Sequence, residues 1–118
     1  MDSLELAKRI VQLADDRRAK DPVILGLQSL SIVADYFVLL SGTSRTQVQS
    51  IARHIEDELS RLGLPAPQKE GDQDAKWFLL DYNDVIVHIF QDETRNFYNL
   101  ERLWNDARRI DLDELPLS

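Results

Sequence analysis

The apolar positions near the start of the chain repeat with a helical period. In residues 2–20 they fall on one stripe, and charged residues fill the opposite face. The stripe consists of Leu4, Leu6, Ala7, Ile10, Val11, Leu13 and Ala14. Asp2 or Ser3 is a candidate N-cap, and Pro22 is expected to end the segment. The pattern predicts an amphipathic helix with one face packed on a sheet.

The next segments predict two buried strands and a second helix. Residues 23–28 (VILGLQ) and 36–42 (YFVLLSG) are short apolar runs, joined by the link 29–35. Residues 43–63 return to a helical period, and Gly63 supplies a left-handed stop. The apolar residues of this period are Val48, Ile51, Ala52, Ile55, Leu59 and Leu62. Strands that alternate with helices favour an α/β domain.

The second half of the chain contains the strongest hairpin pattern. Residues 76–82 (KWFLLDY) and 85–90 (VIVHIF) are rich in aromatic and β-branched residues. Asn83 and Asp84 lie between them, and Asn tolerates the positive φ of a tight turn. We therefore expect the two strands to pair antiparallel.

The remaining segments complete a single domain. Residues 64–76 form a loop rich in proline and polar residues, with a short edge strand at 68–70. Residues 92–110 predict short helical turns, and the residues expected to pack on the sheet are Phe97, Leu100, Leu103 and Trp104. Residues 110–118 predict an acidic, mobile tail. The predicted fold class is α/β, with one domain over residues 1–109 that has a mixed β-sheet and flanking helices.

Length, charge and composition narrow the class of protein. A chain of 118 residues, 43% of them hydrophobic and none of them cysteine, suits one globular core without disulfides or thiolate metal sites. The chain contains no signal-peptide pattern and no run of about 18 apolar residues, so we expect a cytoplasmic protein without a membrane segment. A net charge of −7 argues against nucleic-acid binding as the main mode and favours a basic partner.

The end of the second predicted strand is a candidate phosphate-binding loop, made of Gly42, Thr43 and Ser44. A P-loop needs a lysine beside the hydroxyl residue, but Arg45 stands there, and a dinucleotide-binding loop needs three glycines. A nucleotidyltransferase loop needs paired carboxylates on the next strand, whereas residues 56–58 (EDE) lie in a predicted helix. The favoured interpretation is a helix cap completed by Gln47. A nucleotide-binding or nucleotidyltransferase-like enzyme that uses this loop is the alternative.

No pattern indicates a cofactor, a metal or a catalytic residue. His54 and His88 are the only histidines, and neither has a second ligand at metal spacing. Arg45, Arg53 and Arg61 recur at eight-residue intervals on the second predicted helix and are a candidate RNA-binding strip. The net charge favours a solvated helix face instead.

Residues 77–93 combine aromatic rings with acidic side chains and contain no lysine or arginine. The rings are Trp77, Phe78, Tyr82 and Phe90, and the acids are Asp81, Asp84, Asp92 and Glu93. An apolar patch with an acidic rim is typical of a docking surface for a basic protein. The alternative is that helices cover both faces of the sheet, and the pattern favours neither interpretation. An exposed apolar hairpin would also allow a homodimer.

The chain contains four notable motifs: ADYFVLLSGTSRTQVQSIA, EG at 70–71, WFLLDYNDVIVHIF and FYNLERLWNDA. In sequence, order and spacing they resemble the ribosomal silencing factor family (RsfS, Iojap-like), and the resemblance covers about residues 22–109. It implies a fold related to the nucleotidyltransferase fold without its catalytic carboxylates, and no enzymatic activity. It also implies binding to the large ribosomal subunit through ribosomal protein number fourteen. That binding blocks joining of the small subunit and slows translation under nutrient limitation.

This hypothesis selects a set of partner-binding candidates: Trp77, Glu70, Asp81, Asp84, His88 and Tyr98. Trp77 would be the aromatic anchor, the carboxylates would meet basic side chains of the partner, and the other two would lie at the rim or support it. Two positions depart from the family pattern. Gly26 stands where the family commonly has aspartate, and Asn83 stands where it has glycine. Asn83 preserves the turn chemistry, whereas Gly26 leaves the role of its position open.

Overall fold

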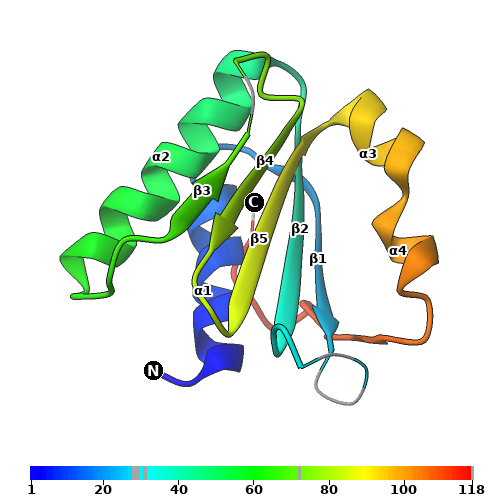
Figure 1. Cartoon of the computed structure of the whole chain (residues 1–118). Helices are drawn as coiled ribbons and strands as arrows, with labels where there is room; N and C mark the ends of the chain where they lie inside the picture. The colour runs from blue at the N-terminus through cyan, green and yellow to red at the C-terminus, as the bar shows by residue number, and fades with distance from the viewer. Residues whose placement is uncertain (28–29, 31, 72, 118) are drawn as a thin grey trace.

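The computed structural model describes the 118-residue chain except residues 28, 29, 31, 72 and 118. Its elements, in chain order, are α1 (Ser3–Asp15), β1 (Lys20–Gly26), β2 (Tyr36–Gly42), α2 (Arg45–Arg61), β3 (Gln68–Glu70), β4 (Trp77–Asp81), β5 (Val85–Gln91), α3 (Asp92–Tyr98), α4 (Leu100–Leu103) and β6 (Arg108–Arg109). They form one sheet with α1 and α2 on one side and α3 and α4 on the other (Figure 1). The predicted single α/β domain with flanking helices is confirmed.

The sheet is mixed, as the sequence predicted. Its strand order is β3-β4-β5-β2-β1-β6. The central pair, β2 and β5, is parallel, and every other pair is antiparallel. The predicted β4–β5 hairpin closes through Asn83, whose φ is +77°, and the Asn83 amide donates to Asp81 Oδ1 at 2.8 Å. The turn therefore uses the tolerance of asparagine for positive φ.

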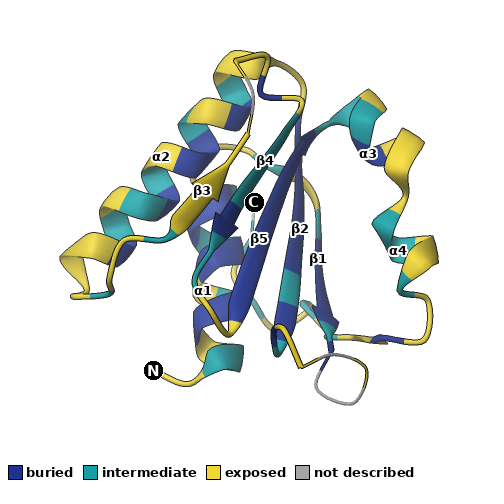
Figure 2. Cartoon of the chain, in the orientation of Figure 1, coloured by how far each residue is buried: buried dark blue, intermediate teal, exposed yellow. Residues whose placement is uncertain are grey.

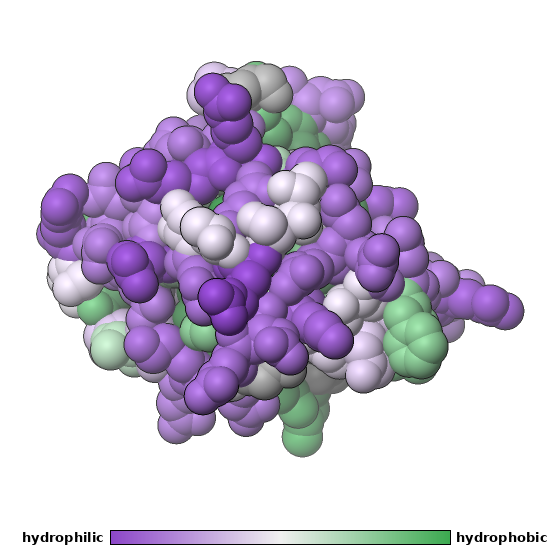
Figure 3. Space-filling model, turned by 90° about the horizontal axis from the view of Figure 1, so that it is seen from above, coloured by the Kyte–Doolittle hydropathy of each residue, from purple (hydrophilic) through white to green (hydrophobic). Residues whose placement is uncertain are grey.

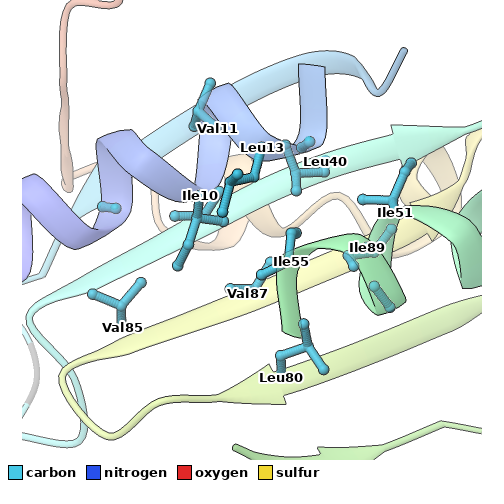
Figure 4. Close-up of a cluster of buried hydrophobic side chains, with 14 of the residues drawn as sticks. Ile10, Val11, Leu13, Leu40, Ile51, Ile55, Leu80, Val85, Val87 and Ile89 are labelled. Atoms are coloured by element: carbon cyan, nitrogen blue, oxygen red, sulfur yellow. The ribbon is translucent and has the colours of Figure 1, made fainter. Parts of the chain in front are cut away.

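The main core lies between the sheet and the two long helices. The stripes of α1 and α2 meet the inward residues of β2, β4 and β5, and the labelled side chains in Figure 4 interdigitate there. The largest buried members on this side include Ile10, Ile51, Ile55, Leu80 and Ile89. Removing this much apolar surface from water is the main stabilising contribution to the fold.

The first helix is shorter than predicted. It ends at Asp15, and Pro22 lies within β1 rather than at the end of the helix. The register between β1 and β2 shifts between Lys20 and Val23. A bulge accommodates a proline because the residue needs no ladder partner for its missing N–H. Pairing with β2 therefore outweighs the helical pattern of residues 16–20.

The last helical segment is split, and this changes which side chains reach the sheet. Asn99 takes φ +47° and ends α3, so the helical spacing does not continue from α3 into α4. Leu100 and Trp104 pack against the second core cluster, as predicted. The prediction for Phe97 and Leu103 is wrong, since they are 81% and 72% exposed.

A buried arginine attaches α3 to the sheet. Arg95 is 7% exposed. Its Nη1 donates to Ser41 Oγ at 2.8 Å and to the Asp21 carbonyl at 2.6 Å, and its Nε donates to Glu101 Oε1 at 2.9 Å. One guanidinium therefore joins the ends of β1 and β2 to both short helices. The sequence analysis did not identify this residue.

The segment after α4 returns to the sheet. β6, which was not predicted, pairs with β1, and the Ile110 amide donates to the Ile24 carbonyl at 2.9 Å. Leu112, Leu115 and Leu117 of the predicted tail are partly buried against the main core. The mobility of residues 110–118 stays a prediction.

We expect Arg95→Ala to lower the free energy of unfolding by about 3 kcal/mol, because it leaves buried acceptors without their donor. Urea denaturation followed by circular dichroism measures this loss. Arg102→Ala is the matched control, because Arg102 is exposed and a surface substitution changes stability by less than about 0.5 kcal/mol. Equal stabilities for the two variants would contradict the role assigned to Arg95.

Candidate partner-binding surface

The strand register places most of the predicted site residues on one face of the sheet. Side chains of directly paired residues point to the same face. Trp77 pairs with Phe90, Leu79 pairs with both Glu70 and His88, and Asp81 pairs with Ile86. These residues therefore share the face that α3 and α4 cover elsewhere. On β3 and β4 this face remains partly open to solvent (Figure 2).

We call this open part, together with the adjoining end of α3, the acidic–aromatic surface. It consists of Glu70, Trp77, Leu79, Asp81 and Tyr98. The rings of Trp77 and Tyr98 lie 4.8 Å apart between centroids. Trp77 and Leu79 of β4 and Tyr98 of α3 form its apolar centre. Its carboxylates are Glu70 of β3 and Asp81 at the far end of β4. Leu79 was not among the predicted residues, although strand alternation places it on the face of Trp77.

Behind this surface, Trp77 is held by His88. The indole Nε1 donates to His88 Nδ1 at 3.0 Å. Because an indole nitrogen only donates, Nδ1 must accept, and the proton of the neutral imidazole lies on Nε2. Nε2 is buried and has no partner among the described residues. His88 therefore orients Trp77 and is itself 5% exposed, so it can act on a partner only through Trp77.

Aromatic rings surround His88 on this face. Phe37 meets the imidazole edge to face at 4.6 Å, and Phe90 stacks on it at 6.1 Å. Burial among these rings disfavours the charged imidazolium and lowers the pKa of His88 from 6.5 to about 4. The imidazole is therefore neutral near pH 7 and remains a hydrogen-bond acceptor for Trp77.

The predicted residues do not form one compact cluster. Trp77, His88 and Tyr98 gather at one end of β4 and β5. Asp81 lies about 13 Å away along the strand, beside the exposed Asp84 of the hairpin turn. Asp81 also accepts the Asn83 amide, so its carboxylate has a structural role in the turn. A partner that meets all of these residues must cover the length of the hairpin.

The two interpretations of the aromatic hairpin each hold in part. Phe90 and Ile86 are 1% and 7% exposed, so this part of the face is covered. Trp77 and Leu79 stay partly exposed because α3 and α4 do not extend over β3 and β4. The surface is therefore narrower than the pattern of residues 77–93 alone suggests.

The loop of Gly42, Thr43 and Ser44 is a helix cap in this structure. Ser44 is the N-cap of α2, and its Oγ accepts the Gln47 amide at 3.1 Å. Gln47 Oε1 accepts from Thr43 N at 2.7 Å and from Thr43 Oγ1 at 3.0 Å. The Gln47 amide nitrogen donates to the carbonyls of Arg17 and Arg18. The Thr43 amide and hydroxyl and the Gln47 amide are thus engaged within the protein.

Close packing favours a small residue at position 42. A Cβ added there would lie 3.1 Å from Val48 Cγ2 and 3.3 Å from Gln47 Oε1. The strand end and the first turn of α2 therefore approach closely. Gly26 differs, since a Cβ there would meet its neighbours at 3.5 Å or more, and a side chain has room.

The other charged candidates remain on the surface. Arg61 pairs with Glu58 at 2.9 Å, while Arg45 and Arg53 are exposed. Within the part of the chain that the structure describes, no three His, Asp or Glu side chains gather as metal ligands would. None of the helices formed by these residues has the length and apolar character needed to cross a membrane.

We expect the free energy of unfolding to fall by about 2 kcal/mol between pH 7 and pH 5 because of His88. The unfolded chain binds a proton at this residue below about pH 6.5, whereas the folded chain does so only near pH 4. In this window the unfolded state binds more protons, so acid destabilises the fold. Urea denaturation at both pH values measures the effect.

His88→Gln is the matched control for this prediction. Its amide oxygen can accept from Trp77, and it does not titrate. Subtracting the pH dependence of the variant's free energy of unfolding from that of the wild type removes the contributions that the two proteins share. The same pH dependence in both would show that His88 takes up its proton freely in the folded state.

Comparison with known proteins agrees with this architecture. The model of the family described as "Ribosomal silencing factor during starvation" (RsfS) matches residues 1–118. The ribosomal silencing factor of Bacillus subtilis is 42% identical over 96% of this chain and 96% of its own, and that of Halalkalibacterium halodurans is 37% identical over 96% and 97%. A crystal structure from Chromobacterium violaceum, 28% identical, covers 89% of this chain and 88% of its own with a TM-score of 0.85. The chain belongs to the ribosomal silencing factor family.

Proposed function

We propose that this protein is a non-enzymatic translational regulator that binds the large ribosomal subunit through ribosomal protein number fourteen. Bound there, it sterically blocks association with the small subunit and slows translation under nutrient limitation. Family membership supports ribosome association. The observation that carries the choice of surface is the partly exposed Trp77, which is held by His88 and shares its face of the sheet with the carboxylates of Glu70 and Asp81.

The physical chemistry of the acidic–aromatic surface suits a basic protein partner. Aromatic anchors surrounded by polar groups contribute most of the binding energy in many interfaces. Glu70 is exposed and Asp81 is partly exposed on the same face as Trp77. The overall charge of −7 adds long-range attraction toward a basic target and increases the rate of encounter. Binding should therefore weaken as salt concentration rises.

The same features support a binding role over catalysis. The loop of Gly42, Thr43 and Ser44 is engaged by Gln47, and His88 is enclosed by rings with its acceptor nitrogen occupied by Trp77. A general base must reach the proton that it removes. We propose that the protein acts by occupying space on the ribosome, in the cytoplasm.

We expect Trp77→Ala to weaken binding to purified large subunits by about 30-fold or more, because the aromatic anchor is lost. Co-sedimentation over a range of protein concentrations measures the affinity. Tyr98→Ala should weaken binding in the same direction. It tests the same surface without disturbing the hydrogen bond to His88.

Leu62→Ala is the control for this experiment. Leu62 is 51% exposed and lies at the end of α2, away from the acidic–aromatic surface. It should bind as the wild type does. Wild-type affinity of both folded variants, Trp77→Ala and Tyr98→Ala, would show that the ribosome contacts another surface.

We also expect the wild-type protein to reduce the formation of joined ribosomes when large and small subunits are mixed. Sucrose-gradient profiles measure the joined fraction. Trp77→Ala should restore joining at protein concentrations where the wild type blocks it. Full joining in the presence of saturating bound wild-type protein would contradict the steric mechanism and leave the binding itself intact.

A further inference from the structure

A hollow beside Trp77 combines aromatic walls with an exposed carboxylate. Its volume is about 740 Å³, and it lies where β5 passes into α3. The residues that line it are Thr43, Lys76, Trp77, Gln91, Asp92, Glu93, Thr94, Phe97 and Tyr98. It adjoins the acidic–aromatic surface at Trp77 and Tyr98.

Three rings form one side of this hollow. Phe97 meets Tyr98 edge to face at 5.1 Å, and Tyr98 lies 4.8 Å from Trp77. Phe97 is 81% exposed, although its sequence position favoured a place against the sheet. Viewed from above, this end of the molecule is mostly hydrophilic and its apolar side chains are scattered (Figure 3). Exposed rings within a polar surface favour contact with a group that is both flat and polar.

The charges around the hollow favour a cation. Asp92 is paired with Lys20 at 3.1 Å, whereas Glu93 is exposed and makes no ion pair among the described residues. Lys76 is the one cation that lines the hollow among these residues, and it is also exposed. The lining therefore carries two carboxylates, one of them paired with Lys20, and one ammonium. Ring faces beside the exposed Glu93 carboxylate attract positive charge.

We propose that this hollow receives an arginine side chain of the basic protein partner. The guanidinium is planar, keeps its charge and stacks on aromatic faces, and it is more weakly hydrated than an ammonium. Trp77, Tyr98 and Phe97 offer the ring faces, and Glu93 offers the carboxylate. The inference rests on the proposed function for the identity of the partner, and it names the side chain that this partner presents.

The test uses the isolated full chain and short peptides. Gly-Arg-Gly is titrated into ¹⁵N-labelled protein at pH 7 while the indole N–H signals are followed by NMR. The chain has two tryptophans, and Trp104, which follows α4 and packs against the second core cluster, is the internal control. We expect the Trp77 signal to move saturably, with a dissociation constant in about the millimolar range, and the Trp104 signal to stay in place.

Two further peptides identify the chemistry. Citrulline has nearly the shape of arginine without its charge, so Gly-citrulline-Gly should bind about fivefold more weakly or worse. Gly-Lys-Gly should also bind more weakly than the arginine peptide. Equal affinity for arginine and citrulline, or for arginine and lysine, would overturn the assignment. So would an unmoved Trp77 signal at about 20 mM peptide, or a preference for ATP with Mg²⁺.

Matched variants test the aromatic and the charged residues that line the hollow. Phe97→Ala and Glu93→Gln should each weaken arginine binding by about two- to fivefold. Leu103→Ala and Glu114→Gln, which change an exposed apolar residue and an exposed carboxylate elsewhere, should leave it unchanged. Lys76→Gln should strengthen it, because a competing cation is removed. Weaker arginine binding in Lys76→Gln would indicate an anion site and overturn the proposal.

Arginine binding in the hollow and ribosome binding by the protein can fail independently of each other. If arginine peptides fail to bind while Trp77→Ala still abolishes co-sedimentation with large subunits, this inference fails and the proposed function stands. If the hollow binds arginine but the wild-type protein does not sediment with large subunits, the hollow stands and the proposed partner is wrong.

Discussion

The candidate functional end of the molecule depends on the hydrogen bonds of the Arg95 side chain. α3 and α4 are too short to be stable alone, and a helix of this length needs tertiary contacts. The bonds from one buried guanidinium to Ser41, the Asp21 carbonyl and Glu101 attach both helices to the sheet. Tyr98 and Phe97 follow within one turn of Arg95. The position of the arginine therefore places the ring of Tyr98 beside Trp77 and the ring of Phe97 beside Tyr98.

A second constraint comes from the opposite side of Trp77. His88 is a polar side chain in an aromatic layer, and its hydrogen bond fixes the indole in one orientation. A ring that is already ordered loses less conformational entropy when a partner binds. The neutral imidazole is the form that accepts from Trp77, since protonation of Nδ1 would remove the acceptor. Trp77 and the His88 that supports it thus lie on neighbouring strands of one hairpin.

Much of the fold was predictable because its signals are local. The stripes of α1 and α2, the β4–β5 hairpin with Asn83 at positive φ, and the edge strand β3 all follow from patterns within a few residues. The errors arise where a distant contact competes with the pattern. β1 begins earlier than expected because it pairs with β2, and the break at Asn99 removes Phe97 and Leu103 from the sheet.

The sequence by itself determined which face of each long helix is buried, which strands form the hairpin, and that Trp77 and the nearby acids are candidates for binding. These properties depend on periodicity and residue chemistry, which a single segment contains. Only the tertiary structure decided that His88 lies behind Trp77, that Arg95 holds α3, and that Phe97 borders a hollow. Each of these placements depends on contacts between different elements. The positions of the helix ends and the register of the strands determine those contacts.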